Sequence, residues 1–317
     1  MDGLPTVSIV VSFFNEEPVL EALVRRLDDA FVSLQDEARP EYVFVDDRST
    51  DRSRAVLLEL RATRPHLKVI TTSRNFGVFP GIMAGLDHAT GDAVITMDAD
   101  LQDPPELVPE LVRAWKREEA DVVYTVRTAR KGESPAKMAA TRLGYEMLRS
   151  ISTVDLPIES GDFRLMSRKV VDLVRRLSEA EPFVRGLVRW VGFKQVPVRY
   201  ERGARLAGDT HFIFYKTKVL KNFISGIISF SDAPAYFPLI AGLALCAVTA
   251  IAVPLATLAI LFGSTGPWLL ALLVLASSAV QLVSIGLVGI YVAKILQNVR
   301  GRPRYVVDSS VGFGDDG

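Results

Sequence analysis

The chain has 317 residues with 37 basic and 37 acidic side chains, so its formal net charge is zero and gives no indication of nucleic acid as a partner. The charges are unevenly distributed. The first two thirds has the composition of a soluble α/β domain, whereas the sequence from about Pro234 to Leu296 is almost free of charge. The single cysteine, Cys246, makes an intrachain disulfide impossible.

Strand-like and helix-like segments alternate through the soluble part. Five short runs are rich in β-branched residues: Val7–Phe13, Tyr42–Val45, Leu67–Thr71, Ala93–Met97 and Asp121–Val126. Helix starts are expected between Asn15 and Pro18, near Asp51, near Pro80 and at Pro104. This alternation predicts an α/β fold in which helices cover both faces of a mainly parallel sheet. A G-x-G-x-x-G pattern after the first strand and a P-loop are both absent from the sequence, which argues against NAD-dependent and ATP-hydrolysing chemistry.

Acidic residues follow two of these predicted strands. Asp98-Ala99-Asp100 ends the fourth run, and Asp46-Asp47 ends the second. Ligands of open α/β sheets bind outside the carboxyl ends of the strands, and paired carboxylates suit a divalent cation with its phosphates. The alternatives are a solvated turn for the first pair and a helix-capping turn for the second. After the third run, Arg74 is expected beside a bound nucleotide.

Two apolar runs are long enough to cross a bilayer core of about 30 Å. Residues 235–262 and 268–292 form these runs, and the turn between them has no charged residue. The alternative is a helical hairpin buried in a large soluble core. Basic residues flank the pair on both sides: Lys216, Lys218, Lys221, Lys294, Arg300, Arg302 and Arg304. The positive-inside rule therefore predicts a multi-pass protein of the inner (plasma) membrane with its soluble domain and both termini in the cytoplasm.

The segment before the first apolar run combines lysines with apolar residues at three- and four-residue spacing between Lys216 and Phe230. Such a pattern is typical of an amphipathic helix lying in the headgroup region, the alternative being a helix packed on the soluble domain. The predicted organisation is a cytoplasmic domain (1–212), a juxtamembrane helix (213–232), a two-helix membrane hairpin (233–298) and a cytoplasmic tail (299–317).

Four motifs give the chain a resemblance to a known family: residues 7–16 (VSIVVSFFNE), 45–51 (VDDRSTD), 73–77 (SRNFG) and 97–106 (MDADLQDPPE). Together they resemble family 2 glycosyltransferases of the A-type, Rossmann-like fold. Residues 161–168 (GDFRLMSR) are similar to the acceptor-side motif of the bacterial glucosyl branch, which makes UDP-glucose the first candidate donor. With two C-terminal spans, the chain is most similar to the polyisoprenyl-phosphate glycosyltransferases, which include dolichol-phosphate mannose synthase and bacterial undecaprenyl-phosphate glucosyltransferases. Three positions depart from the family pattern: Ser12 replaces a usual proline, Arg48 a usual glycine, and residues 75–80 lack polar side chains often found there.

The resemblance implies roles for individual residues. Phe14, Glu16 and Asp47, with Asp46 and Arg74 close by, would hold the nucleoside of a UDP-sugar. Asp98, Asp100 and Gln102 would bind or orient Mg²⁺ or Mn²⁺ and the diphosphate. Asp162 would lie on the acceptor side as the catalytic residue. A phosphate monoester has a second pKa of about 6 and hardly needs a base, so Asp162 could instead orient the acceptor, support the metal, bind a sugar hydroxyl or cap a strand.

A doubly charged acceptor phosphate requires cations near the bilayer surface. The candidates are Arg127, Arg130, Arg199, Arg202, Arg205 and Lys216. The expected activity is inverting transfer of a sugar from a nucleotide-sugar, UDP-glucose first, to polyisoprenyl (undecaprenyl) phosphate at the cytoplasmic face. Relatives often form tetramers, so a homo-oligomer is also expected. Two alternatives remain: a glycosyltransferase acting on a lipid or polysaccharide hydroxyl, and a non-catalytic sugar-nucleotide-binding membrane scaffold.

Overall fold

The computed structural model describes residues 3–127, 160–177, 179, 184–200, 233–262 and 267–314. The chain divides into two compact units. Of the described residues, the larger unit contains those up to Tyr200 together with those from Pro303 onward, and the smaller unit contains the apolar hairpin. The predicted juxtamembrane helix (213–232) lies outside the described residues.

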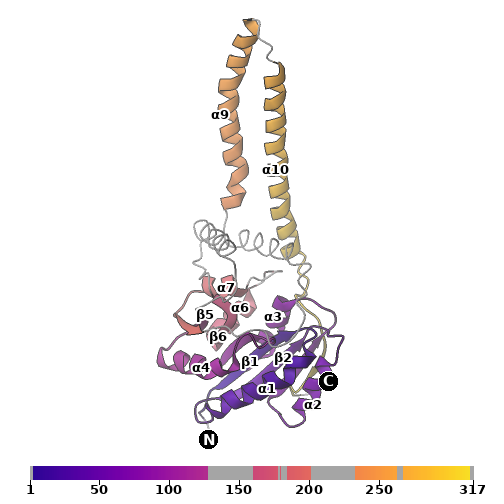
Figure 1. The fold of residues 1–317 in the computed structure, drawn as a ribbon, viewed down its shortest axis with the longest axis vertical. Helices are drawn as coiled ribbons and strands as arrows, with labels where there is room; N and C mark the ends of the chain where they lie inside the picture. Colours follow the sequence, from indigo (N-terminus) through magenta and orange to yellow (C-terminus); the bar gives the residue numbers. More distant parts are fainter. Residues whose placement is uncertain are drawn as a thin grey trace. The chain divides into compact units, whose positions relative to one another are not determined.

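A mixed, mainly parallel sheet forms the centre of the larger unit (Figure 1). Its strand order is β7-β5-β6-β4-β1-β2-β3-β8. Only β6 and β8 run antiparallel to their neighbours among the described strands, so the others end at one common edge. The strands are β1 (Thr6–Phe13), β2 (Arg39–Asp46), β3 (Leu67–Thr72), β4 (Ala93–Asp98), β5 (Val122–Arg127), β6 (Ser160–Ser167), β7 (Gln195–Tyr200) and β8 (Val307–Val311).

Helices cover both faces of this sheet, as the sequence predicted. Because side chains alternate along a strand, Ile9 packs into one apolar core and the next residue, Val10, into the other. The first core contains residues of α1 (Glu17–Val32), α2 (Ser53–Arg61) and α4 (Val108–Arg117), and the second contains residues of α3 (Val78–His88), α6 (Arg168–Arg176) and α7 (Val184–Trp190). A short 3₁₀ turn, η1 (Pro105–Leu107), precedes α4. Burial on both faces explains why the central strands are mostly apolar.

The five predicted strands are confirmed, and the helices begin within a few residues of their predicted starts. Three further strands complete the sheet: β6, the strand expected beside Asp162, and β7 and β8, which were not predicted. Strand β8 lies within the stretch that the sequence placed in a tail, yet it pairs with β3. The expected cap of α1 also differs: Glu16 precedes the helix without a side-chain cap, while Asn15 bonds to a neighbouring loop instead.

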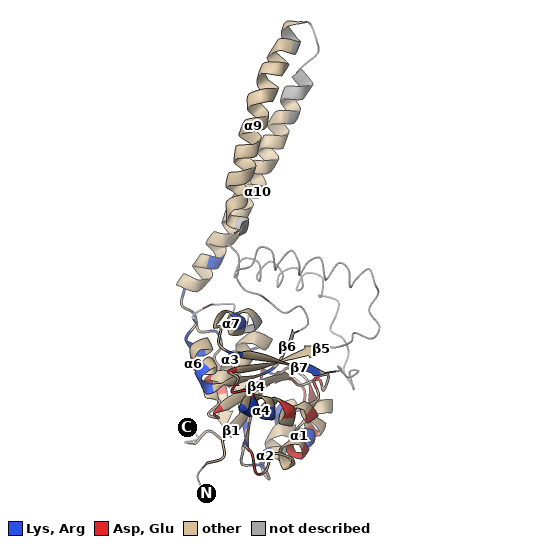
Figure 2. Ribbon diagram, turned by 90° about the vertical axis from the view of Figure 1, so that its left-hand side faces the viewer, with Lys and Arg blue, Asp and Glu red and all other residues tan. Residues whose placement is uncertain are grey.

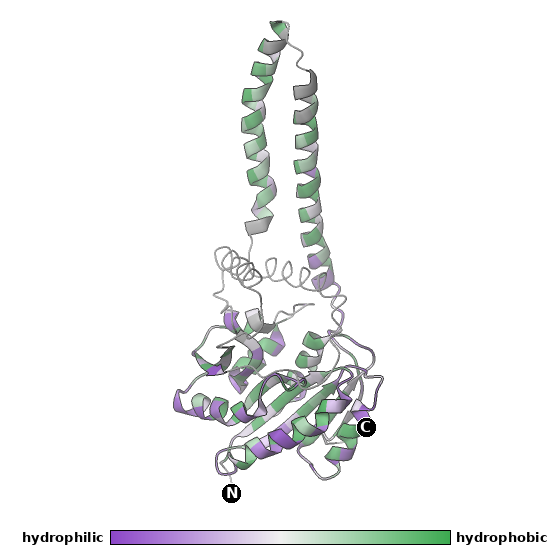
Figure 3. Cartoon of the chain, viewed as in Figure 1, coloured by the Kyte–Doolittle hydropathy of each residue, from purple (hydrophilic) through white to green (hydrophobic). Residues whose placement is uncertain are grey.

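The smaller unit consists of two long apolar helices, α9 (Ala233–Leu261) and α10 (Pro267–Val299). Figures 2 and 3 show that they are almost without charged residues and largely hydrophobic. Both are long and apolar enough to cross a membrane, over Ala235–Leu258 and Leu273–Val299, and only 6% and 0% of their most apolar windows are buried. Such exposure is inconsistent with a hairpin buried in a soluble core.

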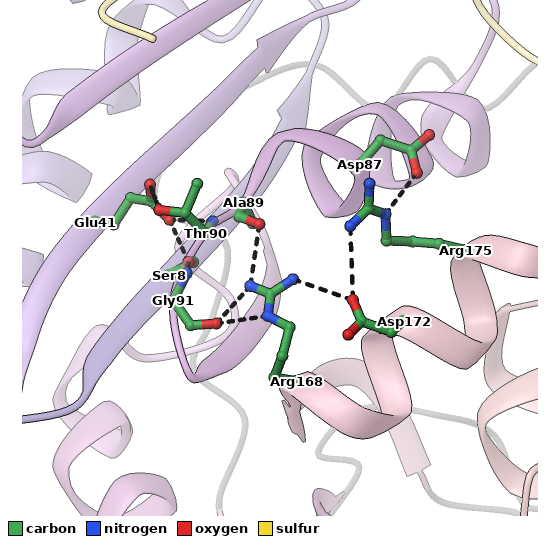
Figure 4. A network of polar contacts seen from close by, with 9 residues as sticks. All are labelled: Ser8, Glu41, Asp87, Ala89, Thr90, Gly91, Arg168, Asp172 and Arg175. Carbon is green, nitrogen blue, oxygen red and sulfur yellow. Dashed lines mark hydrogen bonds and ion pairs between the residues drawn. The ribbon is translucent and has the colours of Figure 1, made fainter. Parts of the chain in front are cut away.

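A network of polar contacts connects the amino ends of the central strands (Figure 4). Glu41 is 4% exposed, and its carboxylate accepts hydrogen bonds from Ser8, from Lys68 (2.6 Å) and from both the N–H and the hydroxyl of Thr90 (2.8 and 2.6 Å). Burial alone would raise the pKa of Glu41, but these hydrogen bonds outweigh it and lower the pKa below its ordinary value. The network therefore stabilises the edge of the sheet opposite the carboxyl ends of β1, β2 and β4.

Candidate functional site

Aspartates of β2, β4 and β6 lie along the carboxyl edge of the sheet. Phe13, the last residue of β1, is in register with Asp46, the last of β2, while Ser12 is in register with Asp98, the last of β4. On the other side of β4 runs the antiparallel strand β6, whose main-chain carbonyl at Asp162 accepts a hydrogen bond from the Thr96 hydroxyl (2.7 Å). Asp46 and Asp98 thus lie along one edge, as the strand-end rule predicted. The antiparallel pairing of β6 with β4 places Asp162 at the same edge.

The loops that follow β1 and β2 are joined by hydrogen bonds. The Asn15 N–H donates to the Ser49 hydroxyl (2.9 Å), and the Asn15 side-chain oxygen accepts from the Thr50 N–H (2.7 Å). Asn15 adopts a left-handed conformation with φ 56°, which asparagine tolerates better than most residues. These contacts fix the loop that carries Phe14, whose side chain is 38% exposed, and Glu16, which is partly exposed.

Of the two adjacent aspartates, Asp46 and Asp47, each is at least 98% buried and each accepts main-chain hydrogen bonds. Asp46 accepts one from the Ser49 N–H (2.8 Å) and so closes its own turn. Asp47 reaches across to the loop after β3, where it accepts from the N–H groups of Phe76 (2.8 Å) and Gly77 (2.6 Å). Asp47 therefore shapes the loop between β3 and α3, and any direct contact with a nucleoside remains a prediction.

The acidic pair after β4 lies on a tight turn. Asp98 and Asp100 are both partly exposed, and an Asp100 oxygen accepts a hydrogen bond from the Gln102 N–H (3.1 Å). Leu101, which lies between Asp100 and Gln102, is 4% exposed and has φ 58°. Its buried side chain anchors an otherwise unfavourable backbone conformation. Among the residues that the structure describes, no three His, Cys, Asp or Glu side chains converge as a metal site. The turn presents the two partly exposed carboxylates of Asp98 and Asp100 to an incoming cation.

A buried hydrogen bond that the sequence did not reveal supports this turn. The hydroxyl of Tyr200, the last residue of β7, donates to a carboxylate oxygen of Asp103 at 2.5 Å. Asp103 is 0% exposed and Tyr200 is 6% exposed. The bond ties the loop that carries Asp100 and Gln102 to the end of a strand three positions away in the sheet. The two residues are 97 positions apart in sequence, so no local signal links them.

Asp162, the candidate catalytic residue on β6, lies beside the guanidinium of Arg164. An Asp162 carboxylate oxygen lies 3.9 Å from a terminal nitrogen of Arg164, and the same nitrogen donates to the Gly161 carbonyl (2.7 Å). The Arg164 side chain is 5% exposed and that of Asp162 is 18% exposed. Asp162 is thus held on a short, internally bonded segment with part of its carboxylate accessible. The alternative of a capping residue finds no support in these contacts, because Asp162 lies within the strand.

The basic candidates divide into described and undescribed residues. Arg74 lies over the Phe76 ring, 4.0 Å from its centroid, in the loop that Asp47 organises. Arg127 ends β5 and Arg199 lies near the end of β7, so both are at the carboxyl edge. The remaining candidates, Arg130, Arg202, Arg205 and Lys216, lie outside the described residues.

The structure shows how Ser12 and Arg48, which depart from the family pattern, fit their surroundings. Ser12 lies in β1 between two paired strands, and its hydroxyl oxygen would be 2.0 Å from a Cβ on Gly81, so α3 approaches the strand closely. Arg48 has φ 65°, a left-handed conformation that glycine adopts without strain. Its guanidinium forms an ion pair with Asp308 at 2.7 Å. Both substitutions are therefore accommodated.

A mainly parallel sheet whose carboxyl edge carries paired aspartates at the ends of β2 and β4 is the arrangement of an A-type glycosyltransferase domain. Residues 8–174 match the family model described as "Glycosyl transferase family 2". The chain belongs to this family. The resemblance inferred from the motifs is thereby confirmed, and with it the A-type fold.

The similarity to known proteins extends over nearly the whole chain. The chain is 42% identical over 309 residues to the "Uncharacterized glycosyltransferase YkcC" of Bacillus subtilis, covering 96% of this chain and 94% of that protein. It is 35% identical to the "Prophage bactoprenol glucosyl transferase homolog" of Escherichia coli (95% and 98% covered) and to the "Bactoprenol glucosyl transferase" of Shigella phage SfII (96% and 98% covered). Among solved structures, the mannosyltransferase PcManGT from Pyrobaculum calidifontis, in complex with GDP-Man and Mn²⁺, is 18% identical with a TM-score of 0.47, covering 94% of this chain and 88% of that one.

Proposed function

We propose that this glycosyltransferase moves a sugar from a nucleotide-sugar, with UDP-glucose the first candidate, to the phosphate of a polyisoprenyl lipid. One observation carries the proposal: a single chain combines an acidic strand-end site with an exposed apolar hairpin. The relatives named bactoprenol glucosyl transferase, matched over nearly their full length, support the same lipid and sugar.

The turn from Asp98 to Gln102 fits a divalent cation, Mg²⁺ or Mn²⁺. Both carboxylates are partly exposed hard oxygen donors, and a donor diphosphate and water would complete the coordination. The bound ion would neutralise the negative charge that develops on the departing nucleoside diphosphate. Phe14, Glu16, Asp46 and Arg74 would surround the nucleoside at the ends of β1, β2 and β3.

The transfer is an in-line displacement at the anomeric carbon of the sugar. An oxygen of the lipid phosphate forms the new bond to this carbon, while the bond to the diphosphate oxygen breaks and its electron pair leaves with the nucleoside diphosphate. Such a step inverts the anomeric centre. The acceptor phosphate is already largely dianionic at neutral pH, so Asp162 would orient the acceptor or a sugar hydroxyl rather than remove a proton.

The course of the chain supports a membrane protein with both ends on one side. Strands β7 and β8 precede and follow the hairpin, yet they belong to one sheet. Two helices that both cross a bilayer return the chain to its starting side. This course of the chain and the flanking lysines and arginines favour an inner-membrane protein whose catalytic domain lies in the cytoplasm. Arg127 and Arg199 would meet the lipid phosphate there, with Arg130, Arg202, Arg205 and Lys216.

The test is a transfer assay on the full chain in lipid nanodiscs. A panel of radiolabelled UDP- and GDP-sugars is offered with undecaprenyl phosphate or undecaprenol, in Mg²⁺, in Mn²⁺ or in EDTA. We expect a labelled sugar-linked lipid phosphate only with the phosphorylated acceptor and a divalent ion. Asp100→Asn should lose this product. The control Asp29→Asn, at an exposed position on α1, should retain it. Transfer to undecaprenol would favour the hydroxyl-acceptor alternative, and UDP binding without any product would favour the scaffold.

A further inference from the structure

The segment that follows the second apolar helix returns to the carboxyl edge of the sheet. Strand β8 runs antiparallel to β3, with Val307 in register with Thr72, the last residue of β3. Just outside the strand, the Ser73 N–H donates to the Val306 carbonyl (2.9 Å). Residues 306–308 therefore enter the sheet beside the loops that follow β2 and β3, which hold the proposed nucleoside site.

We propose that this C-terminal segment forms the outer wall of the nucleoside end of the donor site, and that Asp308 is a positioning residue for the loop that carries Asp46 and Asp47. The proposal rests on the proposed function, since it assumes that a sugar nucleotide binds at this edge.

One connection runs through the main chain. The Val306 carbonyl fixes Ser73, and the adjacent Thr72, 0% exposed, donates its hydroxyl hydrogen toward Asp47 (3.0 Å) and the Arg74 carbonyl (2.8 Å). Asp47 in turn holds the N–H groups at the start of α3. Each contact lies within the loop after β3 or joins it to Asp47, so a displacement of residues 306–307 is transmitted to the nucleoside loop.

The second connection is a side-chain ion pair. Asp308 contacts Arg48 at 2.7 Å, and Arg48 directly follows Asp46 and Asp47 with a left-handed backbone. A non-glycine residue is disfavoured in this conformation, so the ion pair helps to hold the turn in place. The two side chains are 51% and 50% exposed, which makes their coupling modest. The pair exists only because arginine stands where the family usually has glycine.

The segment is anchored away from the site, which lets it act as a fixed support. The Tyr305 hydroxyl donates to Asp87 at the end of α3 (2.8 Å), and burial, with the Asp87 hydrogen bond, raises the pKa of Tyr305 above its ordinary value. Arg304 donates to the Glu179 carbonyl (3.1 Å). Beyond β8, the Phe313 ring packs edge-on against His88, with centroids 5.4 Å apart. Contacts on both sides of β8 thus fix the position of Asp308.

The experiment compares Asp308→Ala, Asp308→Glu, Arg48→Ala and the double alanine variant in the full chain, with Ser310→Ala as the control on the same exposed side of β8. We measure the KM for the donor, kcat, the Kd for UDP and hydrogen exchange of residues 46–50 and 72–77. Asp308→Ala is expected to raise the donor KM and the UDP Kd about three- to fivefold at unchanged kcat and to speed exchange in both loops. Asp308→Glu should retain wild-type values. The double variant should bind UDP as tightly as either single variant, because both substitutions remove the same ion pair.

The outcomes separate this proposal from the proposed function. Unchanged UDP affinity and loop exchange in Asp308→Ala would overturn the positioning role, and so would an Arg48→Ala defect much larger than that of Asp308→Ala, which would mean that arginine contacts the donor directly. A wild-type protein that binds UDP but transfers no sugar would refute the proposed function alone. A wild-type protein that does not bind UDP would overturn both.

Discussion

Replacing Tyr200 by phenylalanine tests the support of the acidic turn. The substitution removes one hydroxyl and keeps the ring, which packs against Phe163 with centroids 6.3 Å apart. The lost hydrogen bond is 2.5 Å long and joins side chains that are 6% and 0% exposed. A buried hydrogen bond to a carboxylate contributes about 1.5–3 kcal/mol, so we expect a loss of about 2 kcal/mol. For a unit of this size, that corresponds to a Tm lower by about 4–8 °C.

The assay is thermal unfolding followed by tryptophan fluorescence, paired with the transfer reaction at several Mn²⁺ concentrations. Tyr124→Phe is the matched control, because Tyr124 lies on the neighbouring strand β5 in a partly exposed position. We also expect Tyr200→Phe to need several-fold more metal for half-maximal rate, since the loop of Asp100 loses a fixed point. If both variants melt within about 1 °C of the wild type, the Asp103 bond does not support the turn and the reasoning fails.

Three further substitutions address the metal, the packing and the pH response. Asp100→Asn should lower turnover at least about 100-fold in the transfer assay at unchanged Tm, because one cation ligand is weakened. Gly85→Ala would place a Cβ 2.2 Å from a methyl group of Val10, so denaturant unfolding should show a loss of about 1–3 kcal/mol. Burial lowers the pKa of His66, more than its interaction with Asp28 raises it. The folded state therefore loses stability as the pH falls below about 6.5. Between pH 7.5 and 5, the free energy of unfolding of His66→Gln should fall less than that of the wild type, as measured by denaturant unfolding.

Strand patterning predicted the fold of the larger unit well because its signals are local. Each of the five runs of β-branched residues became a strand, and the rule that ligands bind at carboxyl ends placed Asp46 and Asp98 on one edge. The pairing of β6 with β4 then placed Asp162 at the same edge, a relation to Asp98 that the motif alone could not show. Long apolar runs likewise identified α9 and α10, since hydropathy over such lengths is distinctive.

The parts that the sequence did not predict depend on long-range pairing. Strand β8 is short, half polar and placed after the apolar helices, so nothing nearby distinguishes it from a tail. Its strand geometry comes from β3, which is more than 200 residues earlier in the chain. The structural use of Asp47 was hidden for the same reason. Its carboxylate receives N–H groups from Phe76 and Gly77, and only the fold brings that loop within reach.

Glu41 at the amino edge of the sheet and the pair Asp98 and Asp100 at the carboxyl edge use their carboxylates differently. At the amino edge, Glu41 is 4% exposed and receives four hydrogen bonds, so its ionised form is stabilised entirely within the protein. At the carboxyl edge, Asp98 and Asp100 are partly exposed on a turn whose neighbour Asp103 is the buried, bonded residue. A charge with solvent access can exchange water for a cation or a hydroxyl, whereas a fully bonded one cannot do so without breaking the fold. Substitutions at the amino edge should therefore lower Tm, and those at Asp98 and Asp100 should lower turnover while leaving Tm unchanged.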